Sequence, residues 1–126
     1  MLSERAKAVK KSLSGVLALR QALTATEEEW QELSQTDGLL GEDLVWQLIL
    51  EKRALERQLA AAGLKNWVRI RQGGLNDRRQ RLMRLRYVKG EPWSVIVTAC
   101  AKSKQYLMRE HNKALEQLAR TEGKRP

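Results

Sequence analysis

Apolar residues recur every three or four positions along much of the chain, which is the spacing that places them on one face of an α-helix. β-branched residues, which favour strands, are sparse outside residues 88–98. Two prolines and eight glycines among 126 residues do not suggest a disordered or collagen-like chain, and 42% apolar residues can bury a thin core. We therefore expect an all-α protein.

Two helices are expected in the first half of the chain. The first covers residues 2–33, where steps of three and four between apolar residues match a coiled-coil seam. Asp37-Gly38 supplies turn chemistry, and a second helix is expected from about Glu42 to a stop at Gly63. The two would form an antiparallel hairpin or a coiled-coil arm.

Charge divides the chain into two unlike halves. Residues 1–64 carry a net charge of −2, whereas residues 65–126 carry +11. Such a division suggests two roles. The near-neutral half is expected to form a homodimer or to dock on a partner such as RNA polymerase. The basic half is expected to meet a polyanion, above all nucleic acid.

Residues 77–126 are predicted to hold three helices in quick succession, after a linker over residues 65–76. Residues 65–71 of this linker would suit either a short helix or an extended segment. The second of them opens at Pro92, which suits a first helical position, and ends near Cys100. The third opens with Ser103 as N-cap, so only two residues lie between these helices. So short a turn is typical of a helix-turn-helix, whose second member enters the DNA major groove.

The third helix is predicted to have two different faces. The residues expected to point inward are Leu107, His111, Ala114, Leu115 and Leu118. The residues expected to read base edges in double-stranded DNA are Ser103, Lys104, Gln105, Met108, Arg109 and Asn112. Glutamine and asparagine can pair bidentately with adenine, and arginine or lysine with guanine, so the chemistry of this flank suits base reading.

Other polar residues are predicted to contact phosphates of the DNA backbone, which fixes the register without reading sequence. On the helix that precedes the helix-turn-helix these are Arg78, Arg79, Arg81, Arg84, Arg86 and Lys89. Elsewhere they are Ser94, Lys102 and Lys113.

The segment from Leu82 to Leu118 resembles region 4 of bacterial sigma factors, and more closely the sigma-like phage regulators of the ArpU and RinA type. The residues that carry the resemblance are Leu85-Arg86-Tyr87, Gly90, Trp93, Ile96, Ser103 and Ala114-Leu115, in register without a gap. Ala101 departs from the pattern, because this turn position is usually glycine and alanine in a left-handed conformation costs ~1–2 kcal/mol. The resemblance implies a sigma region 4-like helix-turn-helix in a sequence-specific transcription regulator, encoded by a phage or prophage.

Two alternatives use the same residues differently. The domain could serve as an adapter or antiterminator that binds RNA polymerase, with DNA secondary. It could also belong to a recognition subunit for phage DNA packaging, similar to a small terminase. In that family the DNA-binding part usually comes first in the chain, which is opposite to the order here.

The composition leaves little material for other functions. One histidine and one cysteine argue against a disulfide framework, a cysteine-rich zinc site or a catalytic constellation. Cys100 recurs with Trp93 and Ile96 at helical spacing and is expected in the core, and His111 is expected at the edge of the core. We expect no enzyme activity, no metal and no cofactor. No uninterrupted apolar run approaches the ~18–20 residues that span a bilayer, so we expect no membrane partner and a cytoplasmic location.

Overall fold

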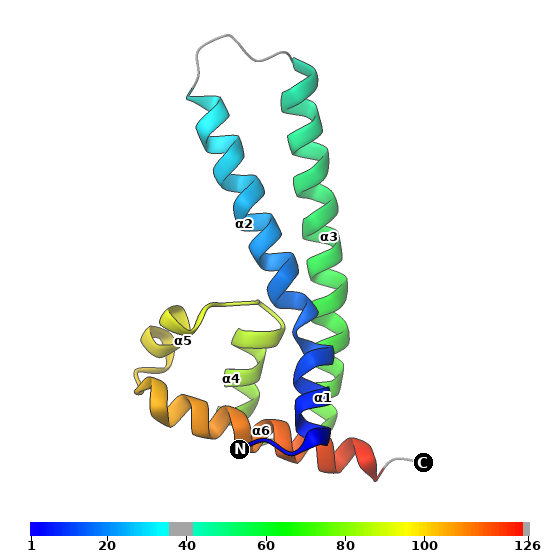
Figure 1. Cartoon of the computed structure of the whole chain (residues 1–126), viewed down its shortest axis with the longest axis vertical. Helices are drawn as coiled ribbons and strands as arrows, with labels where there is room; N and C mark the ends of the chain where they lie inside the picture. Colours follow the sequence, from blue (N-terminus) through cyan, green and yellow to red (C-terminus); the bar gives the residue numbers. More distant parts are fainter. Residues whose placement is uncertain (36–41, 125–126) are drawn as a thin grey trace.

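The computed structural model describes residues 1–35 and 42–124, and all regular secondary structure in these residues is α-helical, as expected. The helices are α1 (Glu4–Leu13), α2 (Gly15–Ser34), α3 (Glu42–Gln72), α4 (Asp77–Tyr87), α5 (Trp93–Cys100) and α6 (Lys104–Gly123). In Figure 1, α2 and α3 lie side by side and form an arm that extends away from a base. The base holds α1, α4, α5, the C-terminal part of α3, and α6, which runs across its lower edge.

The first predicted helix is interrupted once, at Ser14. The Ser14 N–H donates to the carbonyl oxygens of Lys10 (3.0 Å) and Lys11 (3.3 Å), and α2 begins at the next residue, Gly15. Serine and glycine are both weak helix formers, which accounts for the break at this pair. The predicted single helix over residues 2–33 is therefore two consecutive helices, one in the base and one in the arm. The turn predicted at Asp37-Gly38 lies outside the described residues.

Helix α3 begins at Glu42 as expected but does not stop at Gly63, so that prediction is wrong. Gly63 lies buried inside the helix, where an added Cβ would come within 2.8 Å of the carbonyl oxygen of Val88. The glycine therefore serves close packing between α3 and the end of α4 rather than chain reversal. In the linker predicted over residues 65–76, the structure favours the helical alternative for the first part, because residues 65–72 continue α3.

The main hydrophobic core draws on both halves of the sequence. Its buried members come from α1, from the end of α3 and the residues after it, from α4, and from α6: Ala6, Val9, Leu13, Ile70, Leu75, Met83, Tyr87, Ala114, Leu115, Leu118 and Ala119. Burial of these side chains is the main force that assembles the base. Residues 1–64 and 77–126 therefore share a core.

A second cluster holds α5 and the start of α6 against α4. Leu82, Ile96 and Leu107 are its buried members, and Trp93 and Cys100 pack against them half-buried. The prediction that Trp93, Ile96 and Cys100 belong to the core is confirmed. This cluster fixes the orientation of the α5–α6 pair relative to the rest of the base.

Polar contacts tie the helices together inside the base. The buried side-chain amide of Asn66 donates to the carbonyl oxygens of Leu13 (2.9 Å) and Tyr87 (2.7 Å), which are the last residues of α1 and α4. Carbonyls at helix ends lack partners within the helix, so these bonds satisfy groups that burial would otherwise leave unpaired. Arg69 of α3 makes a bidentate ion pair with Glu122 of α6, with N–O distances of 2.8 and 3.0 Å.

None of the described helices has an apolar stretch of the length that crossing a bilayer requires.

Candidate nucleic-acid interface

The connection between α5 and α6 is short and well defined. Ala101 adopts the left-handed conformation (φ 52°), Lys102 follows, and Ser103 is extended and caps α6 by accepting the N–H of Tyr106 at 3.2 Å. The predicted end at Cys100 and the predicted cap at Ser103 are confirmed. Helix α5 begins one residue later than predicted. Pro92 is its N-cap, and Trp93 is its first helical residue.

The inward face of α6 is the one that the sequence predicted. All its members are buried: Leu107, His111, Ala114, Leu115 and Leu118. Because these side chains pack among residues of α1, α3, α4 and α5, the rotation of α6 about its own axis is fixed. The opposite flank is therefore held facing outward.

That outward flank contains the residues predicted to read bases. Ser103, Lys104, Gln105 and Arg109 are exposed, and Met108 and Asn112 are half-buried. Four of them line a shallow depression in the surface: Lys104, Gln105, Met108 and Arg109. Ser103 and Asn112 are partly engaged within the protein, since the Ser103 hydroxyl oxygen caps the helix and the Asn112 side-chain oxygen lies 3.2 Å from Nδ1 of His111.

His111 anchors this flank from below through a buried hydrogen bond of 2.6 Å between its Nε2 and the hydroxyl of Tyr87. The Trp93 ring also packs nearly perpendicular to the imidazole, with ring centroids 5.1 Å apart. Burial lowers the pKa of His111 to about 4 and raises the pKa of Tyr87 to about 12, so both are neutral at pH 7. Tyr87 then donates to Nε2, and Nδ1–H donates to Asn112. His111 is 1% exposed, so it lies inside the core rather than at its edge, where the sequence had placed it.

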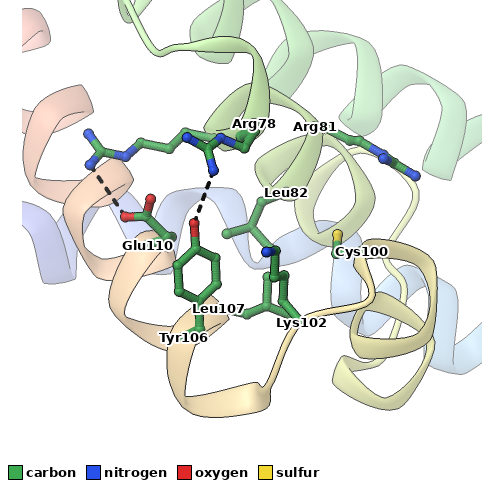
Figure 2. Close-up of a pocket in the computed structure, with 9 residues that line it drawn as sticks. Arg78, Arg81, Leu82, Cys100, Lys102, Tyr106, Leu107 and Glu110 are labelled. Atoms are coloured by element: carbon green, nitrogen blue, oxygen red, sulfur yellow. Dashed lines mark hydrogen bonds and ion pairs between the residues drawn. The ribbon is translucent and has the colours of Figure 1, made fainter.

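The residues predicted to contact phosphates divide into three groups. Arg78 and Lys102, with Arg81, are exposed and surround a cavity of about 110 Å³ between α4 and the α5–α6 turn (Figure 2). Leu82 and Leu107 also line this cavity. The structure thus brings cations of α4 next to the start of α6.

Tyr106 completes this cavity, and sequence reasoning missed it. Its hydroxyl accepts a long hydrogen bond of 3.5 Å from Arg78, and the ammonium of Lys102 lies 5.5 Å from its ring centroid. In Figure 2, Arg81 extends toward the opposite side, where it donates to the carbonyl oxygen of Ala99 at 3.2 Å. The available signal was the place of Tyr106 on the polar side of α6, three residues after the cap.

The second group of cations makes contacts within the protein. Arg79 pairs with Glu110 of α6 at 3.3 Å and also donates to Gln117. Arg86 donates to the carbonyl oxygen of Glu91 at 3.0 Å and lies 4.9 Å from the Trp93 ring centroid.

The remaining predicted phosphate contacts are spread over the surface. Arg84 is exposed, but its guanidinium lies 5.2 Å from the ring centroid of Trp67 on α3, so the structure does not bring it to the start of α6. Lys89, Ser94 and Lys113 are exposed, and the ammonium of Lys113 lies 4.0 Å from Glu110.

No arrangement for metal binding is present in the described part of the chain, where no three His, Cys, Asp or Glu side chains gather closely enough to hold an ion. Cys100 is a half-buried free thiol. Comparison with models of protein families, with curated proteins and with solved structures finds no match to this chain.

Proposed function

We propose that the protein is a sequence-specific double-stranded DNA-binding regulator of transcription, of phage or prophage type, and that α5 and α6 act as a helix-turn-helix. The observation that carries the proposal is the outward flank of α6. It presents Lys104, Gln105 and Arg109 at the start of a helix whose opposite face is locked into the core. Side chains that read base edges in the major groove need this combination of polar chemistry, exposure and rigid support.

Electrostatics supports the same orientation. Arg78, Arg81 and Lys102 lie beside the start of α6, where contacts to backbone phosphates would hold that helix in the groove. The N-terminus of α6 itself carries a partial positive charge that favours a phosphate. The proposal involves no catalytic step.

The first test is selection of bound duplexes from a random pool, followed by titration of the recovered sequence at several salt concentrations. A single preferred sequence is expected, with affinity that falls steeply as salt rises, by a slope near −0.9 in log K for each phosphate neutralised. Recovery of unrelated duplexes with equal affinity would contradict the proposal.

Variants then test the placement of α6. Gln105→Ala and Arg109→Ala are each expected to relax the preference at one base position by ~1–3 kcal/mol. Lys104→Ala is expected to weaken binding to all duplexes if its ammonium contacts a phosphate. Lys11→Ala, an exposed lysine of α1, removes the same charge away from this flank and serves as the control. Parent-like binding by all three α6 variants would show that another surface is used.

The adapter alternative predicts a different result. On that hypothesis, RNA polymerase would be retained in a pull-down after the DNA has been digested. Loss of polymerase on digestion would instead indicate that DNA bridges the two proteins.

A further inference from the structure

The outer side of α3 exposes large apolar side chains. Trp46 is 57% exposed, Leu50 59%, Leu64 64% and Val68 46%. We call these four residues the outer α3 face. Large apolar side chains that gather on one exposed face of a helix mark an interaction surface.

The four residues form one straight row. An α-helix turns 100° per residue, so Leu64 has the same orientation as Trp46, and Leu50 and Val68 both lie about 40° from it. The row extends over ~33 Å, at 1.5 Å per residue. Exposed Arg53, Arg57 and Ala61 fill the space between its ends. The inner side of α3 is already used, because α2 packs against it along the arm.

The spacing of the row is the same when it is read in either direction. Four positions separate the first pair, Trp46 and Leu50, and four separate the last pair, Leu64 and Val68, with Arg57 midway between the pairs. A dimer with two-fold symmetry uses one patch twice, so the patch must be complementary to its own reversed copy. This row meets that condition for two antiparallel α3 helices.

From this symmetry we infer that the outer α3 face binds a second copy of this chain, with the two α3 helices antiparallel and Arg57 at the two-fold axis. In this register Trp46 faces Val68 of the second copy, and Leu50 faces Leu64. Arg53 faces Ala61, which leaves room for the long side chain. The inference concerns α3 alone and does not depend on DNA binding by α6.

The centre of this interface is its weak point. Two Arg57 guanidinium groups would lie near each other, and like charges oppose association. Arginine can lay its aliphatic part along an apolar surface and keep its charged end in water. The row is about 10 Å wide, one helix diameter, so each copy contributes roughly 330 Å², which is less than stable specific interfaces bury. We therefore expect a dimer that dissociates on dilution.

Sedimentation equilibrium of the full chain over a wide concentration range tests the association. The parent is expected to shift from monomer to dimer, and Leu50→Asp combined with Leu64→Asp is expected to remain monomeric with an unchanged helical circular dichroism signal. Arg57→Leu should strengthen the dimer by removing the like charges. Lys11→Leu makes the same kind of change on α1 and should leave the equilibrium unchanged. A parent that remains monomeric, or a double aspartate variant that still dimerises, overturns the inference.

Cysteine cross-linking in a Cys100→Ser background tests the register. A disulfide needs Cα atoms ~4.4–6.8 Å apart, so only residues that face each other can form one. Arg57→Cys is expected to cross-link to itself. Trp46→Cys is expected to cross-link only when mixed with Val68→Cys. Self-linking of Trp46→Cys with none of Arg57→Cys would overturn the antiparallel register.

Discussion

The base and the arm of this molecule are both helical, yet they enclose their side chains to very different degrees. The largest fully buried side chains of the base include Tyr87, Ile70 and Leu118. In the arm, α2 buries Val16, Leu23 and Thr26, while α3 leaves Trp46 and Leu50 largely exposed. The same helical periodicity therefore gives a closed core where several helices meet, and an open surface where only two helices meet.

The largest expected difference between the two regions is in the free energy of unfolding. Leu118→Ala removes a fully buried side chain from the base and should lower stability by ~2–5 kcal/mol. Leu50→Ala in the arm should change it by less than ~0.5 kcal/mol at concentrations where the chain is monomeric. Urea denaturation of both variants measures this. Equal losses would show that the arm is as closely packed as the base.

Lowering the pH should reduce the free energy of unfolding, because His111 is buried in the neutral form in the helical base of the molecule. The pKa of this group is about 4 in the folded protein and near 6.5 when unfolded, so the unfolded state binds more protons between these values. Stability should be full above pH 6.5 and fall as the pH is lowered toward 4, by roughly 2 kcal/mol at pH 5. The urea midpoint at pH 7 and at pH 5 tests this, and His111→Gln should remove most of the difference. An equal loss of stability in the His111→Gln variant would mean that other groups cause the pH dependence.

Removing the donor of Asn66 should have an effect of similar or smaller size. Asn66→Asp keeps the shape of the side chain but leaves the carbonyl oxygens of Leu13 and Tyr87 without their donors, which should cost ~1–3 kcal/mol or more because the new group is acidic. Asn66→Ala separates loss of the bonds from the added charge. Thermal unfolding of the two variants measures the cost of losing the hydrogen bonds and the cost of the added charge. Parent-like stability in the alanine variant would mean that water replaces the amide.

Two glycines at the junction of arm and base are expected to respond to alanine in opposite directions. Gly63→Ala would force a Cβ against the Val88 carbonyl and should destabilise by ~1–3 kcal/mol. Gly15 has no heavy atom within 4 Å of an added Cβ, so Gly15→Ala should stabilise by a few tenths of a kcal/mol up to ~1 kcal/mol. Melting temperatures of the pair distinguish them. A shift of the same sign in both would contradict the packing role of Gly63.

Local chemistry in the sequence was enough to predict several helix ends. Ser103 caps α6 because its hydroxyl oxygen accepts the N–H of a residue three positions ahead. The role of Gly63 could not be predicted, because the glycine is required by the close approach of the Val88 carbonyl, which is distant in sequence. The connection of Asn66 to α1 and α4 depends in the same way on contacts between distant segments.

In the candidate interface too, some features follow from local sequence and others only from contacts between distant segments. Helical periodicity alone separated the buried side of α6 from its polar flank. It did not show how the arginines of α4 divide among neighbours, with Arg79 toward α6, Arg84 toward α3 and Arg86 toward α5. Three arginines of similar predicted role thus differ in their partners, because side-chain direction around a short helix surrounded by others is set by tertiary packing.

The position of Asn66 also bears on how the molecule comes apart. α3 runs through both the arm and the base, and one amide on it engages the ends of two other helices. Displacing α3 would leave the carbonyl oxygens of Leu13 and Tyr87 without a donor, at two distant points of the chain. Melting of the base should consequently proceed as one cooperative transition, while the far end of the arm, beyond this amide, is free to fray earlier.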